Sequence, residues 1–159
     1  MARRWKYSTK ELQAIVETYR NAGEPWPAIT RQIATWAMTK GLWQPRQSDV
    51  VEQLSALLSE AMRQDYYTDP QGRRVRAKHA VRSAKNGEQT FLWHDMRIAP
   101  RDFMLVAFQQ RRRLIAGDCH QLKMDVDSYN QNTNCGKPIQ LVLDFSRDVE
   151  EMEPPMAAS

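Results

Sequence analysis

The sequence is poor in cysteine and has no long apolar run. Its two cysteines in 159 residues exclude a scaffold held by several disulfides and are typical of a protein from a reducing compartment. No stretch approaches the roughly 20 apolar residues of a membrane-spanning helix. No apolar signal segment follows the basic start at Arg3 and Arg4. With 42% hydrophobic and 26% charged residues, the composition is that of a globular protein. We therefore expect a soluble, cytoplasmic protein that makes no membrane contact.

Catalytic and metal-binding signatures are also missing. The sequence contains no GxxxxGK[ST], GxGxxG or GxSxG motif. His79, His94 and His120 lack the i, i+4 or CxxC spacing of zinc sites. Asp118, Cys119 and His120 are consecutive, so on a helix their side chains point about 100° apart and cannot meet at one metal ion. We therefore predict that the protein is not an enzyme and uses no metal or cofactor.

Positive charge is concentrated in the first part of the chain. Residues 1–90 carry 15 Lys and Arg against 9 Asp and Glu, whereas residues 91–159 carry 8 against 10. Residues 70–87 contain six cations and no acid. Such a patch attracts polyanions, of which nucleic acid is the commonest inside a cell. The alternative is a solvated basic face that has no partner.

Three amphipathic helices are expected first. Ser8 and Glu11 form a capping box that opens the first helix. The second is expected to begin near Pro27 and to end at Gly41. The third begins near Ser48 or Asp49, either of which can cap a helix, and extends to Arg63.

A basic hairpin is expected next. Tyr66–Thr68 has strand chemistry, and Asp69–Gly72 is a turn with Pro at its second position and Gly at its fourth. In residues 73–81, apolar residues and His79 alternate with cations, so one face of the strand packs and the other is cationic. The residues that follow, Lys85–Glu88, are interpreted as a linker.

Three short helices followed by a basic hairpin resemble a winged helix-turn-helix domain, over residues 5–82. In that family the third helix enters the major groove and the hairpin, or wing, contacts the backbone or the minor groove. The resemblance implies that residues 48–63 are the recognition helix and residues 66–81 the wing, with double-stranded DNA as the partner. It implies a small transcriptional regulator or an architectural DNA-binding protein. The residues it assigns to DNA are Arg3, Arg4, Lys6, Gln44, Arg46, Gln47, Ser48, Gln53, Arg73, Arg74, Arg76 and Lys78.

The third helix also carries Asp49, Glu52 and Glu60 near the side that would face DNA, where carboxylates repel phosphate. The alternative function is therefore a non-catalytic protein-interaction module, or an accessory subunit of an assembly that processes nucleic acid.

A long helix is expected from Pro100 to about residue 132. Apolar residues recur there at alternating spacings of three and four, which is the heptad seam of a coiled coil. The seam predicts a homodimer, with a second stripe that includes Phe103 and Ala107 packing on the chain's own domain. The alternative is a helical hairpin that folds back at Gly117. The seam residues are Leu105, Phe108, Arg112, Ile115, Cys119, Leu122, Val126 and Tyr129.

The predicted fold is therefore mainly α with a small β hairpin. A winged helix-turn-helix domain spans residues 1–85, and a helical extension that dimerises spans residues 86–132. Residues 133–159 are expected to form a loop, a short strand at Ile139–Phe145 and a frayed acidic tail.

Overall fold

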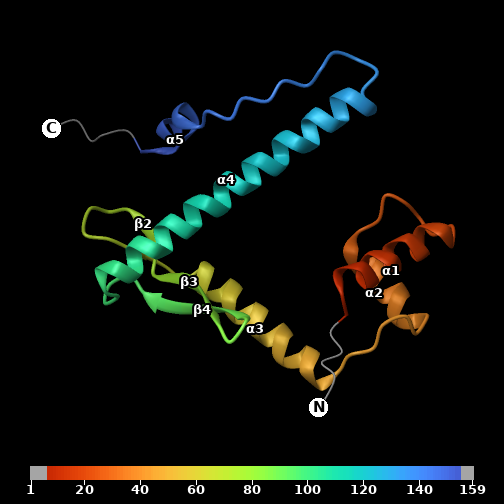
Figure 1. Ribbon diagram of the computed structural model, residues 1–159, viewed down its shortest axis with the longest axis horizontal. Coiled ribbons are helices and arrows are strands. Elements are labelled where there is room, and N and C mark those ends of the chain that lie inside the picture. Colours follow the sequence, from red (N-terminus) through yellow and green to blue (C-terminus); the bar gives the residue numbers. More distant parts are fainter. Residues whose placement is uncertain (1–6, 155–159) are drawn as a thin grey trace. The chain divides into compact units, whose positions relative to one another are not determined.

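The computed structural model describes residues 7–154 and divides into two compact units, one ending at Gln64 and the other beginning at Asp65. The division falls earlier than the domain boundary that we expected at residue 85. The described residues form five helices and two antiparallel sheets of two strands each, so the fold is a mixture of helices and small hairpins (Figure 1).

The first unit contains three helices, α1 Thr9–Asn21, α2 Thr30–Thr39 and α3 Gln47–Arg63. The predicted capping box is confirmed. The Ser8 hydroxyl accepts a hydrogen bond from the Glu11 backbone N–H, and the Glu11 carboxylate accepts one from the Ser8 N–H. α1 packs on α2 through Tyr19, whose ring meets Trp36 edge-on at 5.3 Å. Tyr19, Ile33 and Ala37 are the buried apolar residues of this unit.

α3 begins close to the predicted position but is not buried. Its N-cap is Arg46, and Asp49 lies in its first turn, where it accepts a hydrogen bond from the Arg46 N–H at 3.0 Å. No residue of α3 is buried, and Val51, Leu54 and Leu58 are each more than half exposed. A three-helix core would cover this apolar face, so the structure does not confirm a winged helix-turn-helix.

The second unit begins with a short hairpin whose two strands have three residues each. β1 Tyr66–Thr68 pairs antiparallel with β2 Arg74–Arg76, and Tyr66 lies opposite Arg76. The predicted turn at Asp69–Gly72 is confirmed. The Asp69 side chain accepts hydrogen bonds from the backbone N–H groups of Gln71 and Arg73, and Gly72 has a φ of 82°, which favours glycine.

The expectation of one hairpin over residues 66–81 is wrong. β2 ends at Arg76, and the strand that follows, β3 Lys78–Lys85, pairs with β4 Glu88–Asp95 in a second sheet. The predicted linker at residues 85–88 is the tight turn of this second hairpin. Asn86 and Gly87 both have positive φ angles, as the common two-residue hairpin turn requires.

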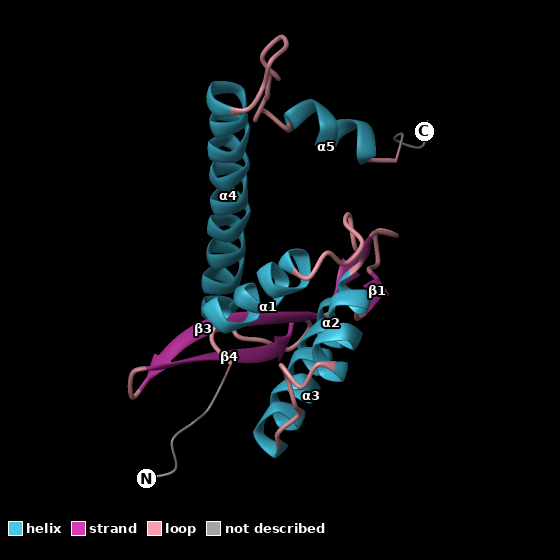
Figure 2. Cartoon of the chain, turned by 90° about the vertical axis from the view of Figure 1, so that its right-hand side faces the viewer, coloured by secondary structure: helices cyan, strands magenta, loops and turns pink. Residues whose placement is uncertain are grey.

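α4 Arg101–Asn132 is a single helix that follows Pro100, as predicted, and packs on β3 with its first turns (Figure 2). Met104 and Ala107 are buried. The Gln110 amide holds the outer edge of β3, because its Oε1 accepts from the Arg82 N–H at 2.7 Å and its Nε2 donates to the Arg82 carbonyl oxygen at 3.1 Å. The helix continues through Gly117, so the alternative in which it folds back there is wrong.

The chain after α4 also differs from expectation. Ile139–Phe145 is not a strand, because nothing within the described residues pairs with it. Instead the Asn130 side chain makes two hydrogen bonds to the Ile139 backbone. Part of the acidic tail is the helix α5 Ser146–Met152, in which Arg147 pairs with Glu151 one turn later.

One ion network joins the strands of the second unit. Asp95, at the end of β4, accepts hydrogen bonds from Lys78 Nζ at 3.0 Å and from the backbone and guanidinium of Arg97. Lys78 Nζ also lies 3.1 Å from Asp65 Oδ2, so it connects β3 to the residue that precedes β1. Hydrogen bonds from Arg97, and then from Lys78, hold the pKa of Asp95 far below its usual range.

We predict that Asp95→Asn lowers the melting temperature at pH 7 and flattens its pH dependence at acid pH. Since folding lowers the pKa of Asp95, its contribution to stability is complete above the unfolded value of about 3.9 and declines as the pH falls below it. Thermal unfolding followed by circular dichroism at pH 7, 4 and 2.5 measures this, with Asp148→Asn on α5 as the matched control. An Asp95→Asn curve that superimposes on wild type at every pH would contradict the role of the network.

Candidate nucleic-acid interface

Two of the cations predicted to bind DNA instead form ion pairs with carboxylates of the same chain. Arg73 Nε lies 2.7 Å from Asp69 Oδ2, and this ion pair closes the β1–β2 turn. Lys78 lies between Asp65 and Asp95. The run from residue 70 to residue 87 contains no acid, but the acids that neutralise it lie just outside this run in the sequence. These two side chains therefore stabilise the fold and offer little net charge to a ligand.

The other two predicted cations of this segment belong to a cluster around Tyr66. The Arg74 guanidinium lies over the Tyr66 ring, 4.3 Å from its centroid. Arg76 pairs with Tyr66 across the hairpin, so both arginines lie on the same face as the tyrosine. Arg111, from α4, is close enough to Arg76 and Tyr66 to interact electrostatically with both. We call Arg74, Arg76 and Arg111 the arginine cluster.

His79, on β3, lies next to the backbone of Arg76, a member of the arginine cluster. It is only 8% exposed, its ring meets Phe108 edge-on at 5.2 Å, and its Nε2 lies 3.0 Å from the Arg76 carbonyl oxygen. Burial, with added repulsion from Arg111 and Arg76, lowers the pKa of His79. The imidazole therefore stays neutral at physiological pH and can donate its Nε2–H to Arg76, which fixes the backbone of β2 beside α4.

Within the described residues, the arginine cluster has no counter-ion. Burial, followed by repulsion from Arg76, lowers the pKa of the Arg111 guanidinium. Within residues 7–154, neither Arg76 nor Arg111 forms an ion pair with a carboxylate. The two guanidinium groups thus repel each other with no acid to offset the repulsion, which is an arrangement that an anion would relieve.

The residues predicted to contact bases lie in the first unit, around the start of α3. Gln47, Ser48 and Gln53 are exposed on α3. The Arg46 guanidinium lies 4.3 Å from the centre of the Tyr7 ring, and the Gln44 N–H donates to the Tyr7 hydroxyl at 3.4 Å. The predicted N-terminal contacts, Arg3, Arg4 and Lys6, fall outside the described residues.

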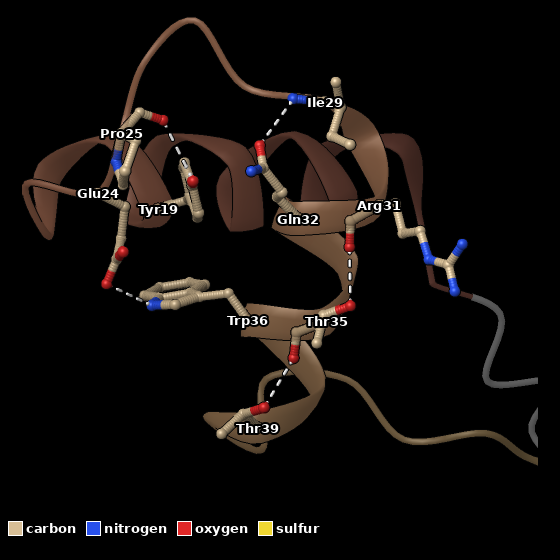
Figure 3. Close-up of a pocket in the computed structure, with 9 residues that line it drawn as sticks. All are labelled: Tyr19, Glu24, Pro25, Ile29, Arg31, Gln32, Thr35, Trp36 and Thr39. Carbon is tan, nitrogen blue, oxygen red and sulfur yellow. Dashed lines mark hydrogen bonds between the residues drawn. The ribbon is translucent and has the colours of Figure 1, made fainter.

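The first unit also has an open depression of about 530 Å³ between α1 and α2 (Figure 3). Two of its aromatic side chains make hydrogen bonds within the unit. The Trp36 indole N–H donates to Glu24 Oε1 at 3.0 Å, and the Tyr19 hydroxyl donates to the Pro25 carbonyl oxygen at 3.2 Å. Because the first bond joins the loop after α1 to α2 and the second joins the same loop to α1, we assign the depression a structural role.

Metal sites and membrane-spanning helices were also sought in the part of the chain that the structure describes. Across residues 7–154, His, Cys, Asp and Glu nowhere come together in a group of three that could hold a metal ion. None of the helices between Tyr7 and Pro154 has the length and apolar character needed to cross a bilayer.

The seam residues all lie on α4, and most of them are uncovered. Leu105, Phe108, Ile115, Leu122 and Tyr129 are between 41% and 54% exposed. Cys119 and Val126 are partly buried, and Arg112 is exposed. The second predicted stripe does pack in part, because Ala107 is buried and Phe103 contacts His94 edge-on at 5.3 Å.

Comparison of the chain with protein-family models, with curated proteins and with solved structures found no match.

Proposed function

We propose that the protein binds nucleic acid through the arginine cluster and performs no chemistry on it. The observation that carries this proposal is the pair Arg76 and Arg111, whose positive charges repel each other and which form no ion pair with a carboxylate in residues 7–154. Guanidinium groups bind phosphate oxygens with two parallel hydrogen bonds, so a phosphate between the two arginines would replace repulsion with attraction.

Tyr66 and Arg74 make nucleic acid a better candidate than a small anion. The Arg74 guanidinium is held over the Tyr66 ring, which adds a third cation and a flat aromatic group to the cluster. Successive phosphates along a strand can meet Arg74, Arg76 and Arg111 in turn, and each contact releases counter-ions. Contacts of this kind give affinity and orientation but do not distinguish sequences.

Sequence preference would have to come from α3. In the winged helix-turn-helix form of this proposal, the partner is double-stranded DNA and Gln47 and Gln53 contact base edges. The exposed polar start of α3 supports that form. Its function would then be that of a small cytoplasmic transcriptional regulator. The carboxylates Glu52 and Glu60 on the same helix weigh against it.

A second candidate function, a protein-interaction module, is favoured by the apolar face of α3. Val51, Leu54 and Leu58 recur at helical spacing and are 65%, 56% and 54% exposed. An amphipathic helix that leaves this face to water is a common docking element for another protein.

For the first proposal, we predict that Arg76→Ala combined with Arg111→Ala weakens binding to any duplex. The slope of log K against log salt should fall by about 0.9 for each phosphate contact that is lost. Fluorescence polarisation with a labelled duplex at four salt concentrations measures both effects. Arg147→Gln serves as the matched control, because it removes an arginine that already has a carboxylate partner and lies on α5, away from the β1–β2 hairpin in the sequence. A double variant that keeps the wild-type slope, or a wild type that does not bind at low salt, would rule out the cluster as the interface.

For α3, we predict that Leu54→Gln with Leu58→Gln changes the free energy of unfolding by less than about 0.5 kcal/mol, as expected for exposed positions. The control Ile33→Gln, in the small core between α1 and α2, should be clearly destabilising. Urea unfolding followed by circular dichroism gives both values. A loss of about 2–5 kcal/mol in the α3 variant would show that α3 packs in a three-helix core, as a winged helix requires.

A further inference from the structure

α4 extends well beyond the part of the fold that supports it. Its first turns pack on β3 through Met104 and Ala107, and Gln110 makes the last hydrogen bond to the strand. The 32-residue helix then continues to Asn132. Ile115, in this second part, is 54% exposed. An isolated helix gains little from such residues, because most helical stability in water comes from packing an apolar face.

We propose that the seam of α4 pairs with the same seam of a second copy of the chain, in antiparallel orientation and with Gly117 at the midpoint. The proposal does not depend on nucleic-acid binding. The seam borders the face that packs on β3. Phe108 belongs to both, because its ring contacts His79 of β3 while the side chain remains 48% exposed, so one helix can contact its own sheet and a partner helix at the same time.

The sizes of the side chains favour this orientation. Each seam residue lies as far before Gly117 as another lies after it. An antiparallel pair therefore places Phe108 opposite Val126 and Ile115 opposite Cys119, so that each layer joins a larger residue to a smaller one. A parallel pair would place identical residues opposite each other, with two phenylalanines in one layer and two cysteines in another. Layers that alternate large and small side chains pack more evenly.

The charges along α4 favour the same orientation. The part before Gly117 carries the run Arg111–Arg113, and the part after it carries Asp125 and Asp127. In a parallel pair, Arg112 would face Arg112 of the second copy inside the seam. In the antiparallel pair, Arg112 faces Leu122 and each arginine-rich part lies along an aspartate-bearing part.

The first part of the test measures self-association of the full chain by light scattering. We expect a mass near twice 18.5 kDa at micromolar concentration. Leu122→Glu should return the mass to that of one chain, because it places a carboxylate in the seam. Gln121→Glu, which adds the same charge at the neighbouring exposed position, is the matched control and should stay dimeric. A wild type with the mass of one chain would overturn the proposal.

The second part tests orientation by disulfide formation between chains that carry one cysteine each. Arg112→Cys and Leu122→Cys are made separately in a background with Cys119→Ser and Cys135→Ser, and diamide serves as the oxidant that accepts the two electrons. In the antiparallel pair these two positions face each other, whereas copies of either position lie several turns apart. We expect a covalent dimer when the two proteins are mixed and little with either alone. Cross-linking of each variant with itself, or no cross-link in any sample, would overturn the antiparallel seam.

Discussion

The second unit depends on the contact between the first turns of α4 and strand β3. Met104 and Ala107 supply the buried apolar surface, Phe108 covers His79, and the Gln110 amide replaces the missing neighbour at the outer edge of β3. A two-stranded hairpin alone is marginally stable in water, so β3 and β4 need this helix. The same contact brings Arg111 from the helix to Arg76 from the hairpin.

The contact between α4 and β3 leaves two surfaces uncovered, the arginine cluster and the seam of α4, and both bear on function. Next to the supported part of α4, the arginine cluster lies without a counter-ion in the described residues. Beyond that part, the seam of α4 is open to a partner. The buried apolar residues of the described chain are few, and Tyr19, Ile33 and Ala77 are among them. Such small cores give modest stability, and association with a second copy or with nucleic acid would add to it.

Local signals in the sequence predicted local structure well. The capping box at Ser8, the turn at Asp69–Gly72 and the start of α4 after Pro100 each depend on residues within a few positions of one another. The Asn86–Gly87 turn has an equally local signal, since this dipeptide favours positive φ angles, and it joins two strands where the sequence analysis predicts a linker.

Contacts between distant segments could not be predicted in the same way. The sequence shows a cationic run without acids, but whether an arginine is free depends on Asp65, Asp69 and Asp95, which only the strand register brings to it. Arg111 was missed as a member of the site because no spacing rule connects it with Arg76. The sequence also predicts more burial of α3 than the structure shows. An amphipathic pattern indicates that a helix has an apolar face but does not show what covers that face.

The central claim, that the arginine cluster is where nucleic acid binds, is tested most directly by amide hydrogen exchange of the full chain with and without duplex DNA at low salt. If nucleic acid binds at the arginine cluster, exchange becomes slower in residues 66–76, the short hairpin that carries Tyr66, Arg74 and Arg76, and is unchanged in α2. Protection confined to residues 47–63, or no protection anywhere in a sample that binds DNA, would contradict it.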